Sequence, residues 1–230
     1  MSGRDTVYVW VGRDTGGQPD AAGGLLRRAG ALLLGRAETE LVLTHDRDGR
    51  PTVRVDEVEV AVSVSRTAGL VAVAARRAGA VGVDVERIRA LPALALARRW
   101  FPPAELAWLA DRPEAARVVD FLRLWTAKES VGKALGLGLR GGGLRRPMPP
   151  PGLPVRPVPG AETLRVGHPP LGGDLVLAVA AQASAQVDVA VVQWPGHEAT
   201  AERSASVERT SLPVVVRGNW SSRCSTRGRL

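Results

Sequence analysis

Apolar residues recur along this 230-residue chain with two periods, one typical of strands and one typical of helices. Alternating or continuous apolar runs predict strands, at 7–11, 41–43, 58–64, 70–75, 81–86, 164–166, 175–181 and 187–192. Apolar residues spaced three and four apart predict helices, at 25–34, 93–100, 103–110 and 114–135, with room for one break in the last of them.

Between and beyond these elements the composition changes twice. Seven prolines from Pro147 to Pro159 predict a stiff, extended linker. From Gly196 onward, the chain is rich in Ser, Thr and Arg, and 196–230 is expected to be a disordered basic tail with a short apolar exception at 212–216.

The last predicted helix carries both lysines of a chain that otherwise uses arginine, with 31 Lys and Arg residues in total. At about 100° per residue, Lys128 falls in the middle of an apolar face, while Glu129 and Lys133 lie one turn apart at its edge. The simplest interpretation is a snorkelling Lys128 and a solvated ion pair. That interpretation does not explain the choice of lysine, whose compact ammonium suits different sites from the planar guanidinium.

The strand predicted at 81–86 carries two acids on one side. Alternation directs Val81, Val83 and Val85 into the core, and places Asp84 and Glu86 on the opposite face, about 7 Å apart at Cα. Gly82 is expected to leave open space beside them. A solvent-facing strand is the simplest interpretation, but two hard oxygen ligands also suit Mg²⁺ better than zinc.

Cysteine content and charge limit the function classes. The single cysteine, Cys224, allows no internal disulfide, so a reducing, cytoplasmic location is expected. No secretory signal and no run of about 20 apolar residues is present, so no membrane span is expected. Half of the net charge of +8 lies in 201–230, and the remaining excess suits an acidic partner or a phosphate-bearing ligand rather than requiring nucleic acid.

Three segments together resemble the signature of 4′-phosphopantetheinyl transferases. They read Gly-Val-Asp-Val-Glu at 82–86, Trp-Phe-Pro-Pro-Ala-Glu at 100–105, and Trp-Thr-Ala-Lys-Glu-Ser-Val-Gly-Lys-Ala-Leu-Gly-Leu-Gly-Leu at 125–139. The similarity is strongest over 81–139 and weaker over 47–75, where Gly49-Arg50-Pro51 and 63–67 resemble family segments. The length is similar to the surfactin-synthetase-activating (Sfp) type.

The resemblance implies a pseudodimer of two similar α+β halves, with an N-terminal half at 1–80 and a C-terminal half at 81–195 that carries the motifs. It implies transfer of phosphopantetheine from coenzyme A to a serine of an acyl or peptidyl carrier protein, with release of 3′,5′-ADP. A monomer is expected, and nucleic acid is not expected as a partner. Fatty-acid, polyketide and peptide carrier proteins all stay open as substrates.

The resemblance also implies roles for individual residues. The Mg²⁺ ligands, which could also hold Mn²⁺, would be Asp84, Glu86 and Glu129, and Glu129 would deprotonate the carrier serine. Lys133 would contact the phosphates of the leaving group and act with Glu129 in catalysis. The expected coenzyme A contacts are Arg47, Arg50, Ser65, Arg66, Lys128 and Lys133, with the Lys128 ammonium reaching out of its apolar face.

Two departures from the family pattern leave alternatives open. Arg66 stands where the family usually has histidine, although arginine can also hold phosphate. The segment ahead of Ser63 is shorter than usual, so an inactive relative is one alternative. A metal-dependent nuclease is another, but its lysine usually lies on the next strand and not on a distant helix. A basic protein that binds nucleic acid through its tail would leave the two lysines unexplained.

Overall fold

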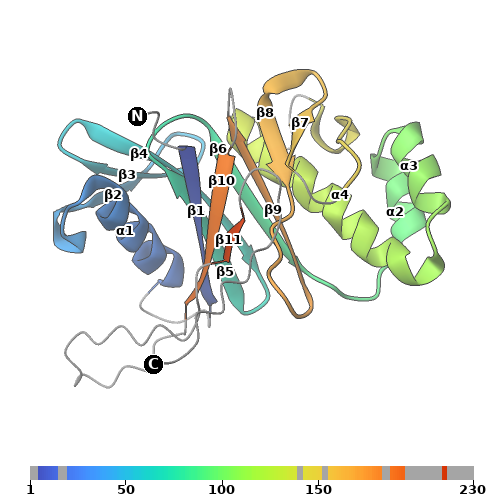
Figure 1. Ribbon diagram of the computed structural model, residues 1–230, viewed down its shortest axis with the longest axis horizontal. Helices are drawn as coiled ribbons and strands as arrows, with labels where there is room; N and C mark the ends of the chain where they lie inside the picture. Colours follow the sequence, from blue (N-terminus) through green and yellow to red (C-terminus); the bar gives the residue numbers. More distant parts are fainter. Residues whose placement is uncertain are drawn as a thin grey trace.

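The computed structural model describes residues 5–14, 20–138, 142–151, 155–182, 187–194 and 214–216 (Figure 1). In this part of the chain two sheets pack together, one with a single helix on its outer face and the other with a long helix. The predicted α+β class is confirmed. The pseudodimer and the division at residue 80 stay predictions.

The first sheet has the strand order β11-β10-β1-β5-β4-β3-β2. Its strands are β1 (Asp5–Arg13), β2 (Val42–His45), β3 (Pro51–Val55), β4 (Val58–Thr67), β5 (Leu70–Arg76), β10 (Val187–Trp194) and β11 (Val214–Val216). β10 comes from the far end of the chain and pairs in parallel with β1, whereas the other pairs are antiparallel. The first sheet therefore draws strands from both ends of the sequence. Apart from β11, the predicted tail at 196–230 lies outside the described residues.

Helix α1 (Ala21–Leu34) packs its apolar face against this sheet, and the short helix η1 (Glu38–Glu40) follows it. Helix α1 begins four residues before the predicted start at residue 25, because the Asp20 carboxylate accepts hydrogen bonds from the amides of Ala22 and Gly23. It ends at Gly35, whose φ of 67° is the left-handed conformation that glycine adopts most readily.

The second sheet has the antiparallel order β6-β9-β8-β7. Its strands are β6 (Val81–Arg87), β7 (Arg156–Val158), β8 (Ala161–Gly167) and β9 (Leu175–Gln182). The helices are α2 (Ala93–Trp100), α3 (Pro103–Ala110), α4 (Glu114–Leu135) and the short η2 (Gly143–Arg145). α4 lies across β6 and β9 and is continuous over the whole predicted range, while α2 and α3 pack at its first half (Figure 1). None of the described helices is long and apolar enough to cross a membrane.

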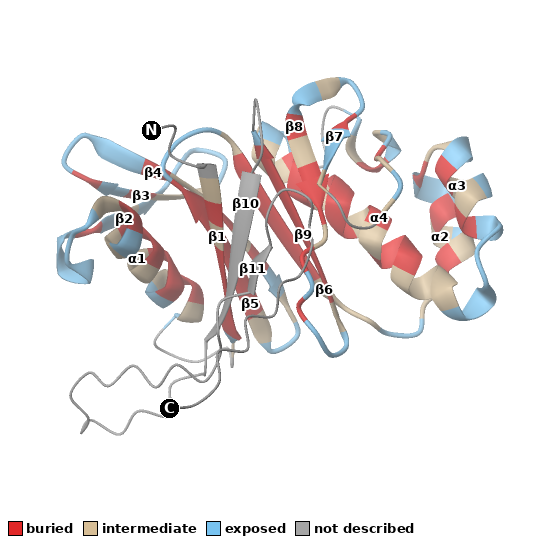
Figure 2. Ribbon diagram, in the orientation of Figure 1, coloured by how far each residue is buried: buried red, intermediate tan, exposed pale blue. Residues whose placement is uncertain are grey.

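The two sheets meet face to face and along one edge. Val81, Val83 and Val85 are buried against strands of the first sheet, as strand alternation predicts (Figure 2). Along the edge, β6 runs beside β4, and two serines of β4 satisfy its backbone. The Ser63 hydroxyl accepts from the Val83 amide at 3.1 Å and the Ser65 hydroxyl from the Val85 amide at 3.3 Å. This junction brings β4, β6 and α4 together.

Candidate functional site

Gly82 lets α4 approach β6 more closely than any other residue would. A Cβ built on Gly82 would lie 1.9 Å from the Ser130 carbonyl oxygen and 2.7 Å from the Ala134 amide nitrogen. The prediction of open space beside Gly82 is therefore wrong, because the backbone of α4 fills that space. The consequence is that residues on this side of α4 reach the acids of β6.

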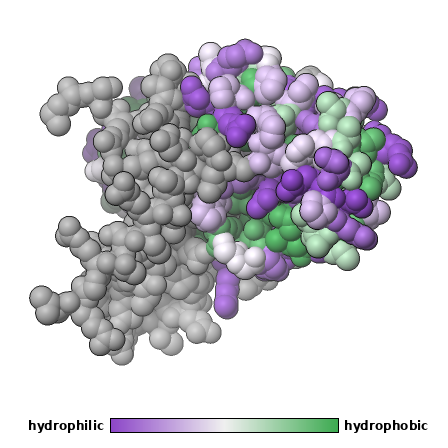
Figure 3. All heavy atoms as spheres, turned by 45° about the vertical axis from the view of Figure 1, so that its right-hand side comes forward, coloured by the Kyte–Doolittle hydropathy of each residue, from purple (hydrophilic) through white to green (hydrophobic). Residues whose placement is uncertain are grey.

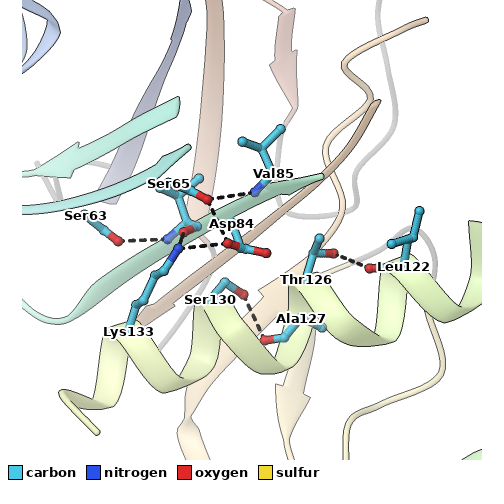
Figure 4. Close-up of polar contacts among 10 residues, drawn as sticks. Ser63, Ser65, Asp84, Val85, Leu122, Thr126, Ala127, Ser130 and Lys133 are labelled. Atoms are coloured by element: carbon cyan, nitrogen blue, oxygen red, sulfur yellow. Dashed lines mark hydrogen bonds and ion pairs between the residues drawn. The ribbon is translucent and has the colours of Figure 1, made fainter. Parts of the chain in front are cut away.

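Lys133 extends from α4 to Asp84 on β6 (Figure 4). Its ammonium donates to the Asp84 Oδ1 at 2.8 Å and to the Val83 carbonyl at 2.9 Å. A solvated ion pair with Glu129, one turn away on α4, was the simplest interpretation of the sequence, but Lys133 pairs with Asp84 in the structure. An ammonium has three N–H donors, so one remains for a further acceptor.

Asp84 is almost completely buried at this junction, with an exposed fraction of 6%. Its Oδ1 also accepts from the Ser65 hydroxyl at 2.7 Å, while its buried Oδ2 has no hydrogen-bond partner among the described residues. Burial raises the pKa of Asp84, which the hydrogen bonds and charge of Lys133 oppose in part. An orphaned carboxylate oxygen in a buried position is an unusual feature and indicates a place for a cation or a donor.

Glu129 adds negative charge to the same region. Burial raises the pKa of Glu129, and the neighbouring carboxylates of Asp84 and Glu86 raise it further, while Lys133 opposes the rise. Glu86 itself is paired with Arg89 at 2.8 Å. The carboxylates of Asp84, Glu86 and Glu129, the three predicted ligands, are thus near enough to repel one another. Lys133 is the cation that contacts Asp84.

As the side chains stand, no three His, Cys, Asp or Glu residues in the described part of the chain form a metal-binding cluster. Mg²⁺ does not require one, since it usually keeps several waters and binds one or two carboxylates together with substrate phosphates. The orphaned Asp84 oxygen and the raised pKa of Glu129 fit such a cation.

Lys128 lies where sequence reasoning does not place it. The ammonium is expected to reach out of its apolar face, but the side chain is fully buried and forms an ion pair with Glu105 at 2.7 Å. It also donates to the Arg146 carbonyl at 2.5 Å and lies 4.8 Å from the centre of the Phe101 ring. This geometry does not favour a phosphate contact. Glu105 was not predicted as a site residue, although its place in the 100–105 motif was a signal.

The remaining residues predicted to contact coenzyme A are spread over β4 and the β2–β3 turn. Arg66 points away from Asp84 and forms ion pairs with Asp14 and Asp20, each at 3.3 Å. The Arg50 guanidinium donates to the Lys133 carbonyl at 3.3 Å and packs against Gly136, at the end of α4.

Arg47 is exposed in the β2–β3 turn. The structure therefore brings Ser65 to Asp84 and Arg50 to the end of α4, and places Arg66 beside α1. The sequence predicted a role for only one of the two serines of β4. Ser65 was expected to contact coenzyme A, whereas Ser63 had no predicted role.

Comparison with known proteins supports the resemblance over the residues that form this site. Residues 80–151 match the model of the 4′-phosphopantetheinyl transferase superfamily. The chain is 39% identical to 4′-phosphopantetheinyl transferase gsp of Aneurinibacillus migulanus over 59 residues. These residues are 26% of the chain and 24% of the relative. The chain is 30% identical to 4′-phosphopantetheinyl transferase HetI of a Nostoc species over 122 residues. These residues are 52% of the chain and 52% of the relative.

A putative 4′-phosphopantetheinyl transferase of a Synechocystis species is 42% identical over 65 residues, which cover 28% of the chain and 26% of the relative. The chain thus spans between a quarter and a half of the length of these curated relatives. Asp84, Glu105, Lys128, Glu129 and Lys133 all fall inside the matched range 80–151, and the family resemblance is confirmed there.

Proposed function

We propose that this chain, a relative of the 4′-phosphopantetheinyl transferases, transfers the 4′-phosphopantetheine group of coenzyme A to a serine hydroxyl of an acyl or peptidyl carrier protein and releases 3′,5′-ADP. The observation that supports this most directly is the convergence of Asp84, Glu129 and Lys133 across the β6–α4 contact. The reaction breaks a pyrophosphate bond and develops negative charge on phosphate oxygens, so it needs cations held at one place.

Mg²⁺ or Mn²⁺ would be held by Asp84 and Glu129, with Glu86 contributing directly or through water. When bound, the ion would neutralise pyrophosphate charge and position the leaving group. The unpartnered Oδ2 of Asp84 is the best-placed ligand atom. Ser65 would keep Asp84 oriented, because its hydroxyl is itself fixed by the Val85 amide.

Glu129 would accept the proton of the carrier serine at its carboxylate, directly or through water. Its raised pKa makes the carboxylate a better base than a fully solvated one. Lys133 would stay on Asp84 and use its third N–H to contact a phosphate oxygen, so one ammonium would link the acidic group to the leaving group.

Coenzyme A would also contact Arg47, Arg50 and Ser65, which lie on the β2–β3 turn and β4. Arg66 would reach a phosphate only by leaving Asp14 and Asp20, and a contact of Lys128 with phosphate stays a prediction that its burial does not support. The monomeric state and the cytoplasmic location likewise stay predictions.

The test is mass spectrometry of an apo carrier protein after incubation with coenzyme A, Mg²⁺ and this protein. The expected result is a mass gain of one phosphopantetheine, which a chelator abolishes and Mg²⁺ or Mn²⁺ restores. Asp84→Asn, which keeps the shape of the side chain, should lose this activity. No mass gain with carrier proteins from fatty-acid, polyketide and peptide pathways would refute the proposal.

A further inference from the structure

The two ends of α4 are held by different parts of the molecule. Its first half packs against α2 and α3, at the end that Figure 3 turns forward, where hydrophilic and hydrophobic residues lie side by side. Its last turn carries Lys133, and the helix ends at Gly136, which has a left-handed φ of 80°. The contacts that hold this last turn matter, because the Lys133 ammonium reaches Asp84 from there.

The backbone that follows α4 folds back onto the helix and closes it. The amides of Leu137 and Gly138 donate to the Gly132 carbonyl at 3.0 Å and 3.1 Å. The Gly136 amide donates to the Lys133 carbonyl at 3.2 Å. The last carbonyls of a helix have no partner inside it, and the returning segment satisfies two of them.

The Arg50 guanidinium closes the same end of α4 from the side of the first sheet. Its Nη2 donates to the Lys133 carbonyl at 3.3 Å, across 83 positions of sequence. A Cβ built on Gly136 would lie 2.8 Å from both Nη atoms, so the guanidinium lies directly against that glycine. A cation at this position also faces the negative end of the helix dipole. Lys133 is thus held at both ends, its carbonyl by Arg50 and its ammonium by Asp84.

The β2–β3 turn fixes the backbone from which Arg50 extends. The Asp46 Oδ1 accepts from the amides of Asp48 and Arg50, each at 2.9 Å. The Asp46 amide donates in turn to the Arg50 carbonyl at 2.9 Å. A carboxylate that binds two amides of its own turn holds that turn in one conformation. A fixed support therefore presents the guanidinium to α4.

We propose that Arg50 is a positioning residue that fixes the last turn of α4 and, with it, Lys133. This proposal rests on the proposed function, in which the third N–H of Lys133 contacts a phosphate oxygen of the leaving group. Arg50 acts through the helix backbone and touches no reacting atom in this role. The role is separate from the proposed contact of Arg50 with coenzyme A, because a guanidinium has five N–H donors and the Lys133 carbonyl takes one.

The first measurement is hydrogen exchange of the backbone amides, which needs no enzymatic activity. Arg50→Met keeps a long side chain but removes the guanidinium, so the amides of 136–138 should exchange roughly fivefold to tenfold faster than in wild type. Exchange in α1 should stay unchanged, which shows that the variant is folded. Arg50→Lys, whose ammonium can donate to the same carbonyl, should restore much of the protection.

The second measurement separates rate from affinity. With both substrates saturating, Arg50→Met should lower kcat roughly tenfold, because the ammonium of Lys133 is held less precisely at the phosphate. Arg50→Lys should recover part of this kcat. Loss of a contact with coenzyme A alone would instead raise the KM for coenzyme A and leave kcat unchanged.

The matched control is Arg54→Met, near the other end of β3. The exposed Arg54 guanidinium also donates to a backbone carbonyl, that of Asp56 at 3.1 Å, and this control should match wild type in both measurements. Wild-type exchange of 136–138 in Arg50→Met overturns the proposal, as does a wild-type kcat in that variant, whether or not the KM for coenzyme A rises. Failure of the proposed function shows differently, as no mass gain on any carrier protein with the wild-type chain, and leaves the exchange result unaffected.

Discussion

The close contact between β6 and α4 at Gly82 provides the sharpest test of the candidate site. Gly82→Ala adds one methyl group where its carbon would lie 1.9 Å from the Ser130 carbonyl oxygen. A carbon and a carbonyl oxygen normally approach to about 3.3 Å. The obstructing atoms belong to the helix backbone, so no change of side-chain rotamer can remove the clash, and the helix itself has to move.

The size of that movement sets the expected effects. The missing separation is roughly 1.4 Å, and a shift of this size would take the Lys133–Asp84 contact, now 2.8 Å, out of hydrogen-bond range. Overpacking a well-packed core typically costs about 1–3 kcal/mol of unfolding free energy. Displacing catalytic groups by about 1 Å can cost on the order of 100-fold in rate. We therefore expect a folded but less stable protein that has lost most of its transfer activity.

The assay is urea unfolding of Gly82→Ala beside the rate of carrier modification. The matched control is Gly24→Ala on α1, where an added Cβ meets no atom within 4 Å. There alanine should stabilise the helix by about 0.5–1 kcal/mol and leave the rate unchanged. Wild-type stability and rate in Gly82→Ala would refute the argument that the site depends on this close approach.

Three further predictions concern charged residues of α4. Lys128→Met should cost about 3–5 kcal/mol of unfolding free energy, because it leaves Glu105 buried and unpaired, and adding Glu105→Gln should recover most of that loss in urea unfolding. Burial raises the pKa of Glu129, so the folded state binds its proton more tightly than the unfolded state does. The unfolding free energy should therefore fall as the pH rises above the usual carboxyl pKa of 4.5, and Glu129→Gln should flatten this fall in unfolding curves taken across that range; an unchanged slope would contradict the argument. Lys133→Arg should lose most of its transfer activity while its melting temperature changes little, because a guanidinium would form a bidentate pair with Asp84 and compete for the oxygens that bind the metal. A wild-type rate would mean that the ammonium is not required.

The sequence by itself determined the elements and the motif. The span of α4 and the inward side of β6 follow from periodicities that depend only on neighbouring residues along the chain, whereas the α+β class was implied by the family resemblance. The retention of lysine at two positions and the pair of acids on one strand also carry the family resemblance, because a spaced motif is a property of the order of residues alone.

Tertiary structure alone decided which charges meet. Periodicity placed Lys128 in the middle of the apolar face of α4, but its ammonium was expected to reach out of that face, and only the packing of α3 supplied Glu105 as its buried partner. Lys133 met Asp84, which is 49 residues earlier, because Gly82 admits the helix backbone and the strand then lies within reach of the ammonium.

The ion pairs of Arg66 also could not be predicted from the sequence. Alternation along β4 places Ser65 toward Asp84, and the next side chain then lies on the opposite face, where Asp14 and Asp20 bind it. A motif fixes which residue types are present and on which side of an element each lies. The partner of a buried charge depends on which distant element packs beside it. A buried charge is costly unless it is paired, so it forms an ion pair or hydrogen bond with a complementary group that the fold brings within about 3 Å.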